Sequence, residues 1–148
     1  MGVLQTYHPS VAAEAAKIPA KTARRWLDNK VIALRGNDSN PTGSGNHCGW
    51  SRNRIAQLAV TQALVEKNVS PSAGAKAALV FSDFGNAGRK PGECFGVCKT
   101  VLFISDDGPM VRNIDFNFPI FDSSNEAVIV CVDLNRIVDH VDSVLAKY

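Results

Sequence analysis

The sequence predicts an α+β protein that is helical in its first half and continues into a small antiparallel sheet and a C-terminal amphipathic helix. Three observations predict this class. Apolar residues recur at helical spacing up to about residue 84, a stretch rich in glycine follows at 85–96, and extended apolar runs begin near residue 99. With 148 residues, of which 45% are hydrophobic, the chain is long enough to bury a real core.

Two short helices open the chain. Ser10 follows Pro9 and is a good N-cap for a helix over 11–17, which Pro19 ends. A second helix over 21–29 places its apolar residues at helical spacing and leaves its cations on the other side. The apolar residues are Ala23, Trp26 and Leu27, and the outward ones are Lys21, Thr22, Arg24 and Arg25.

The stretch 35–49 consists mainly of glycine, asparagine, aspartate, serine and proline, which predicts a loop between short strands. Ser51 caps a third helix over 52–67. Arg52 and Arg54 lie in its first turn, where the helix dipole disfavours cations, so we expect an external anionic partner; solvated surface charge is the alternative. The pair Ser70-Pro71 opens a fourth helix that ends near residues 81–84.

Beyond the glycine-rich stretch the pattern becomes extended. We expect strands over 99–105, 110–116 and 127–132, with a turn at 106–109. A last helix over 134–148 carries an apolar stripe with the spacing of a heptad seam, which either covers the sheet or meets its copy in a homodimer. The stripe, which is the predicted dimer interface, consists of Leu134, Val138, Val141, Leu145 and Tyr148.

The change of pattern near residues 85–96 predicts two units, 1–84 and 97–148, joined by a linker. Charge changes sign at the same place. Residues 1–80 carry ten lysines and arginines against four acidic residues, whereas residues 81–148 carry six against ten. The near-neutral total of +2 is therefore the sum of a basic half and an acidic half, which suggests a module that binds a polyanion attached to one that does not.

No apolar run reaches the length of a membrane span, and residues 1–10 lack a secretion signal, so we expect a cytoplasmic protein, associated with the nucleoid if it binds DNA. Its four cysteines are then expected to be free thiols. Cys94 and Cys98, with Cys131 or His140, could supply zinc ligands, but a second closely spaced ligand pair is missing, so no metal or other cofactor is predicted.

An enzyme is also not predicted. The C-terminal half has no glycine-rich phosphate loop, no paired histidine ligands and no recognisable nucleophile motif. Its one pair of adjacent carboxylates, Asp106 and Asp107, falls in an expected hairpin turn.

Two short helices, a loop rich in glycine and asparagine, and a third helix together describe a winged helix-turn-helix. The second helix would offer Arg forks that match the acceptor pair of a guanine edge. A wing bearing Arg35, Asn37, Asn46 and His47 would reach a neighbouring groove or phosphate chain.

Several segments of the chain resemble the winged-helix DNA-binding domain of the MerR family of transcriptional regulators and its excisionase-like relatives. They are 11–16, 21–27 with its Thr-Ala-Arg-Arg-Trp, 43–45, 50–55 with its Trp-Ser pair, and 64–70, within about residues 8–80. The resemblance implies that Thr22, Arg24 and Arg25 meet the major groove or its phosphates. It further places Arg35, Asn46 and His47 at the backbone or minor groove, and Arg52 and Arg54 at phosphates.

The resemblance stops near residue 84, where the family continues into a long dimerisation helix and this chain into a predicted sheet. We therefore expect a sequence-specific regulator of transcription that binds double-stranded DNA as a homodimer. Its acidic part would dimerise, contact other proteins such as the transcription machinery, or sense a ligand. The alternatives are an adaptor that binds other proteins and an excisionase-like architectural DNA-binding protein.

Overall fold

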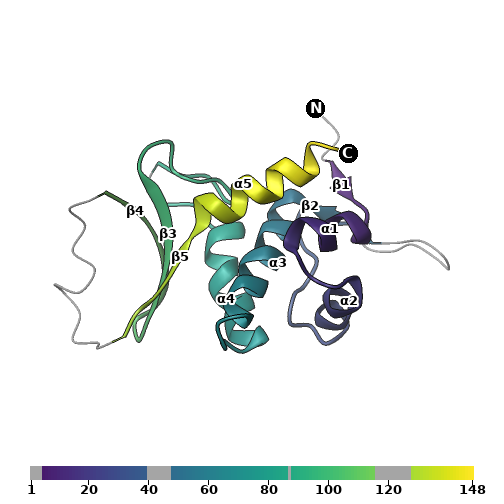
Figure 1. Cartoon of the computed structure of the whole chain (residues 1–148), viewed down its shortest axis with the longest axis horizontal. Helices are drawn as coiled ribbons and strands as arrows, with labels where there is room; N and C mark the ends of the chain where they lie inside the picture. The colour runs from purple at the N-terminus through teal and green to yellow at the C-terminus, as the bar shows by residue number, and fades with distance from the viewer. Residues whose placement is uncertain (1–4, 40–47, 87, 116–127) are drawn as a thin grey trace.

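The computed structural model of the chain describes residues 5–39, 48–86, 88–115 and 128–148. Within them the fold is α+β, with five helices and two small antiparallel sheets. The helices occupy the middle and one side of the molecule, and the larger sheet forms the other end (Figure 1). The described residues include no helix that combines the length and apolar character of a membrane span.

The helices begin and end close to the predicted positions. They are α1 (Pro9–Ala16), α2 (Ala20–Asp28), α3 (Arg52–Val65), α4 (Pro71–Ser82) and α5 (Leu134–Leu145). Ser51 and Ser70 cap α3 and α4 as predicted, each accepting a hydrogen bond from a backbone N–H three residues on. The predicted cap of α1 is wrong by two residues: His8 is the N-cap, and its Nδ1 accepts the hydrogen bond of the Ser10 N–H.

The larger sheet has the order β4-β3-β5 and is antiparallel throughout. Its strands are β3 (Lys99–Ser105), β4 (Gly108–Ile114) and β5 (Val130–Asp133). The smaller sheet, which the sequence did not predict, pairs β1 (Thr6–Tyr7) with β2 (Trp50–Ser51). It joins the start of the chain to the residues just before α3.

The core consists of two hydrophobic clusters, and each takes residues from both predicted units. The first gathers around α1, α2 and α3 but also includes Val141, Val144 and Leu145 of α5. The second joins Val60 and Phe81 to Leu102, Val111 and Leu134. Because α5 returns to pack on α1 and α3, the two predicted units share their cores, and nothing in this packing separates them.

The same packing corrects the predicted dimer interface. Leu134, Val138, Val141 and Leu145 are at most 5% exposed, since they lie inside the two clusters of one chain. Tyr148 is exposed, and its hydroxyl donates a hydrogen bond to Glu14 of α1. The stripe is apolar because it completes the chain's own core, so it is not available to a second copy.

The predicted linker is also tied down. Asn86 and Arg89 form an antiparallel bridge, and Arg89 is 7% exposed. Its guanidinium donates to main-chain oxygens at the end of α4 and just beyond it, among them those of Phe81 and Phe84. A helix leaves its last carbonyls without partners, and here a buried arginine satisfies them.

Candidate nucleic-acid interface

The outward face of α2 carries the cations that the sequence placed there. Ala23 and Trp26 are each 4% exposed and fix the orientation of the helix against the core. Lys21, Arg24 and Arg25 are exposed, and Thr22 is half-buried. The spacing of the buried pair determines this arrangement, because residues three apart share one side of a helix.

Within residues 5–39, 48–86, 88–115 and 128–148, these cations have no strong partner. Arg24 lies 3.8 Å from Asp28, but both side chains are largely exposed, so this ion pair contributes little and leaves Arg24 open to another anion. The N-cap of α2 is Pro19, and no side chain caps the backbone N–H groups of the first turn. That end of the helix therefore adds a partial positive charge to the same region.

Two further lysines flank α2 and were not among the predicted site residues. Lys17 follows α1 and Lys30 follows α2; both are exposed, and both have positive φ, at 55° and 58°. A left-handed residue after a helix can be predicted from sequence when it is glycine or asparagine, the residues usual there. Lysine occupies both positions here, so the sequence carries no such signal.

The base of the predicted wing is closed. Ser39 and Gly49 form an antiparallel bridge through hydrogen bonds of 2.9 and 2.8 Å. A side chain at Gly49 would collide with Thr6 and Ser39, so the close approach of these segments requires glycine. Asn46 and His47, the predicted contacts of the wing tip, lie outside the described residues.

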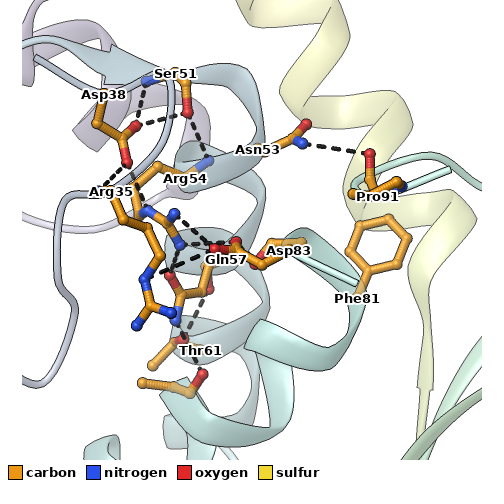
Figure 2. Close-up of polar contacts among 12 residues, drawn as sticks. Arg35, Asp38, Ser51, Asn53, Arg54, Gln57, Thr61, Phe81, Asp83 and Pro91 are labelled. Atoms are coloured by element: carbon orange, nitrogen blue, oxygen red, sulfur yellow. Dashed lines mark hydrogen bonds and ion pairs between the residues drawn. The ribbon is translucent and has the colours of Figure 1, made fainter. Parts of the chain in front are cut away.

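Asp38, at the same base, is a fully buried carboxylate. Its oxygens accept hydrogen bonds from the backbone and hydroxyl of Ser51, from the Arg35 N–H and from Arg54, as Figure 2 shows. One side chain thereby joins the loop after α2 to the start of α3.

Arg54 corrects a prediction. It is 2% exposed, and its guanidinium makes ion pairs with Asp38 at 2.9 Å and with Asp83 at 3.0 Å. Gln57 accepts a further hydrogen bond from it (Figure 2). The Gln57 side chain in turn donates to the Ala75 carbonyl. A buried arginine matched by two carboxylates is a structural group, so Arg54 does not contact phosphate.

The pKa values of this pair follow from competing effects. Burial by itself would raise the pKa of Asp83 and lower the pKa of Arg54, because it disfavours both charges. The hydrogen bonds between the two side chains outweigh that cost. The pKa of Asp83 consequently lies below its usual value and the pKa of Arg54 above it.

Arg52 and Arg35 are more exposed than Arg54, and each lies near one carboxylate. Arg52 makes a bidentate pair with Asp142 of α5, at 2.7 and 2.9 Å, and donates to the Gly92 carbonyl, so it joins α3 to α5 instead of facing outward as predicted. Arg35 is half-exposed with its Nε 3.7 Å from Asp83. Of these two, Arg35 alone keeps a guanidinium that solvent reaches easily.

The structure thus brings Lys21, Thr22, Arg24 and Arg25 together on α2 and removes Arg52 and Arg54 from the predicted set. Among the described residues no three histidine, cysteine, aspartate or glutamate side chains gather as a metal site requires. No protein-family model matches this chain, and no curated protein is significantly similar to it.

Proposed function

We propose that the chain is a double-stranded DNA-binding regulator of transcription and that α2 is its recognition helix. One observation carries the proposal: α2 buries Ala23 and Trp26 and exposes Lys21, Arg24 and Arg25, which have no buried acidic partner in the part of the chain that the structure describes. An exposed arginine can bond the two acceptors of a guanine edge, and an exposed lysine can neutralise a phosphate.

The surroundings of α2 support a winged helix-turn-helix of the kind found in the MerR family. Residues 17–19 make a short turn between α1 and α2, as in helix-turn-helix proteins. The Ser39–Gly49 bridge, the Trp-Ser pair of β2 and then α3 follow in the order that the family resemblance implies. In this proposal Arg35 and the wing, with Asn46 and His47, contact the phosphate chain beside the groove that α2 enters.

The proposal separates two kinds of arginine in the basic half. Arg24 and Arg25 are exposed and act on DNA, whereas Arg52 and Arg54 hold elements of the fold together. Like charges that lie close together on a surface repel one another and destabilise the folded chain slightly, but they attract a polyanion. Double-stranded DNA supplies that charge at about one phosphate per 1.7 Å of helix axis.

The test measures binding to a mixed-sequence DNA duplex by fluorescence anisotropy at several salt concentrations. We expect binding that weakens steeply with salt. We expect the double substitution Arg24→Ala and Arg25→Ala to remove most of the affinity and to lower the salt slope by about one for each phosphate that the protein no longer neutralises. The matched control is Arg112→Ala, an exposed arginine on β4 at the other end of the molecule (Figure 1).

Circular dichroism would show that the double variant still folds. Absence of binding to the duplex at low salt, or equal binding by the double variant and the wild type, would remove the proposal. Selection from a random duplex library then gives the preferred sequence.

A role as a protein-interaction adaptor is the second candidate, and one observation favours it. Phe84 is 57% and Met110 37% exposed, and both border a hollow between the end of α4 and β4. Exposed apolar residues around a hollow suit contact with another protein, such as a component of the transcription machinery. Capture of a partner from nuclease-treated extract, abolished by Phe84→Ser, would support this role; capture that depends on DNA would contradict it.

A further inference from the structure

The three-stranded sheet has two outer edges, β4 and β5, and their hydrogen-bond partners differ. At β4, the side-chain amide of Asn86 donates a hydrogen bond to the Val111 carbonyl at 3.0 Å, so the segment after α4 covers that edge. At the other edge, within the residues that the structure describes, the backbone of β5 bonds to β3 alone. Among the described residues, the β4 edge thus has a hydrogen-bond partner in the segment after α4, and the β5 edge has none.

The β5 edge lacks the usual protection against pairing. Natural edge strands carry lysine, proline or a bulge, which discourage another chain from adding to the sheet. Residues 128–132 are Val-Ile-Val-Cys-Val, with no charge, glycine or proline before Asp133. Val128 is 77% exposed, and the Cys131 side chain is exposed as well. An unguarded edge with strong β propensity favours a strand as its partner.

The two sides of β5 indicate which strand fits. Val130 and Val132 face the helices and pack on the second hydrophobic cluster. Cys131 faces the other side, opposite Phe103 of β3. A partner must place apolar side chains on the helix side, must bring no unpaired charge, and must run in an extended conformation.

We propose that the partner is a second copy of this chain and that two β5 strands pair antiparallel, with Cys131 opposite Cys131. In that register Val130 of each copy lies opposite Val132 of the other, so the apolar layer continues across the junction. Asp133 lies opposite Ile129, and no two like charges oppose each other. The two sheets of three strands become one continuous sheet.

The position of the sheet is compatible with DNA binding. The sheet and α2 lie at opposite ends of the long axis of the molecule (Figure 1). Pairing through β5 therefore leaves the exposed face of each α2 free. The association itself needs no DNA, so a dimer that binds no duplex would support this interface while removing the proposed function.

The first experiment measures the mass of the protein in solution by light scattering at micromolar concentration under reducing conditions. We expect twice the chain mass of 15.9 kDa for the wild type and the single mass for Cys131→Lys, because a lysine at the centre of the edge opposes its own copy. The matched control is Cys98→Lys, at an exposed cysteine outside the strands, which should remain a dimer. A monomeric wild type, or a folded Cys131→Lys variant that stays dimeric, would overturn the proposal.

The second experiment does not depend on a charged variant. Directly opposed residues of an antiparallel pair have Cβ atoms about 4.5 to 5.5 Å apart, within reach of a disulfide after small adjustment. Mild oxidation with diamide should give a covalent dimer for the wild type and for Cys98→Ser, and none for Cys131→Ser. A dimer by light scattering that fails to cross-link through Cys131 would overturn the register, and cross-linking through another cysteine would overturn the interface.

Discussion

Three arginines show how burial and the partners within reach give one residue type three roles. Arg24 is exposed and faces solvent, Arg54 is buried between two carboxylates, and Arg89 is buried among main-chain carbonyls with its guanidinium 5.1 Å from the centre of the Phe81 ring. Burial lowers the pKa of Arg89. Arg24 can bind a ligand, because this binding would break no contact that the fold needs.

The buried pair around Arg54 makes a prediction about stability. Arg54→Met removes the cation and leaves Asp38 and Asp83 without their partner, so we expect the free energy of unfolding to fall by about 3 to 5 kcal/mol. Urea unfolding measures it. Arg24→Met, at an exposed position, should change stability by no more than about 0.5 kcal/mol. Equal losses in the two variants would mean that the buried pair contributes nothing special.

Asp83 makes a prediction about pH. Its pKa is lowered in the folded chain, chiefly because the hydrogen bonds of Arg54 outweigh burial. A carboxylate of this kind binds its proton more readily when unfolded, so its contribution is complete above the unfolded pKa, near 3.8, and is lost as the pH falls through the lower folded value. Urea midpoints measured down to pH 3 should fall less steeply for Asp83→Asn than for the wild type.

Residue-level expectations from the sequence succeeded where local spacing decides the outcome. Ala23 and Trp26 fix which side of α2 is buried, and the exposed cations follow from that. Arg54 could not be placed in the same way, because its partners Asp38 and Asp83 lie 16 and 29 residues away. An arginine in the first turn of a helix indicates that an anionic partner is needed. It does not indicate whether that anion comes from the same chain or from a ligand.

At the scale of elements, α3 is the centre around which the other helices pack. Residues on all its sides are buried, among them Ile55, Gln57, Val60 and Leu64. Helices α1, α4 and α5 surround it and cover its polar positions too. A helix enclosed in this way needs internal partners for its polar groups, which Gln57 finds at the Ala75 carbonyl.

Most elements were predictable, and the misses have physical reasons. The limits of β3 coincide with the predicted ones, because a continuous apolar run between turn residues is a strong signal. The pair β1–β2 was missed because two-residue strands carry no period. The prediction of a linker over 85–96 was wrong. The glycines suggested a segment without fixed contacts, whereas the Arg89 side chain donates hydrogen bonds that hold the segment in place.

Arg89 gives the element-scale prediction. Lysine keeps the charge but has no planar fork, so it cannot donate to several carbonyls at once. We expect Arg89→Lys to lower the free energy of unfolding by about 2 kcal/mol or more, since buried carbonyls at the end of α4 lose their donors. Arg112→Lys, at an exposed arginine of β4, is the control and should leave the urea midpoint unchanged. A similar midpoint for both variants would contradict the capping role.

At the scale of the whole molecule, ion pairs join the basic and acidic halves that the sequence distinguishes. Arg52 pairs with Asp142 and Arg54 with Asp83, and each pair crosses from one half to the other. Part of the charge asymmetry therefore serves the fold. Among the described residues of the acidic half, the cations of α2 have no such partner, which is why we assign the proposed function to them.

The shared cores predict a single unfolding transition. Trp26 and Trp50, the two tryptophans of the chain, both lie in the first cluster, whereas Leu102 of the sheet lies in the second. We expect Leu102→Ala to cost about 2 to 5 kcal/mol and to shift the tryptophan fluorescence midpoint together with the far-ultraviolet dichroism midpoint. Val128→Ala, at a largely exposed position, is the control. Two separate transitions would show that the predicted units fold independently.

The return of α5 onto α1 has a consequence for biosynthesis. Val141, Val144 and Leu145 complete a cluster that Val11 and Ala12 begin, and the ribosome adds them long after those two residues. Helices α1 and α2 therefore emerge long before the α5 side chains that cover them, and this cluster stays incomplete until α5 has been translated. Folding governed by such distant contacts is slow, and until it is complete the apolar sides of the first helices are open to chaperones.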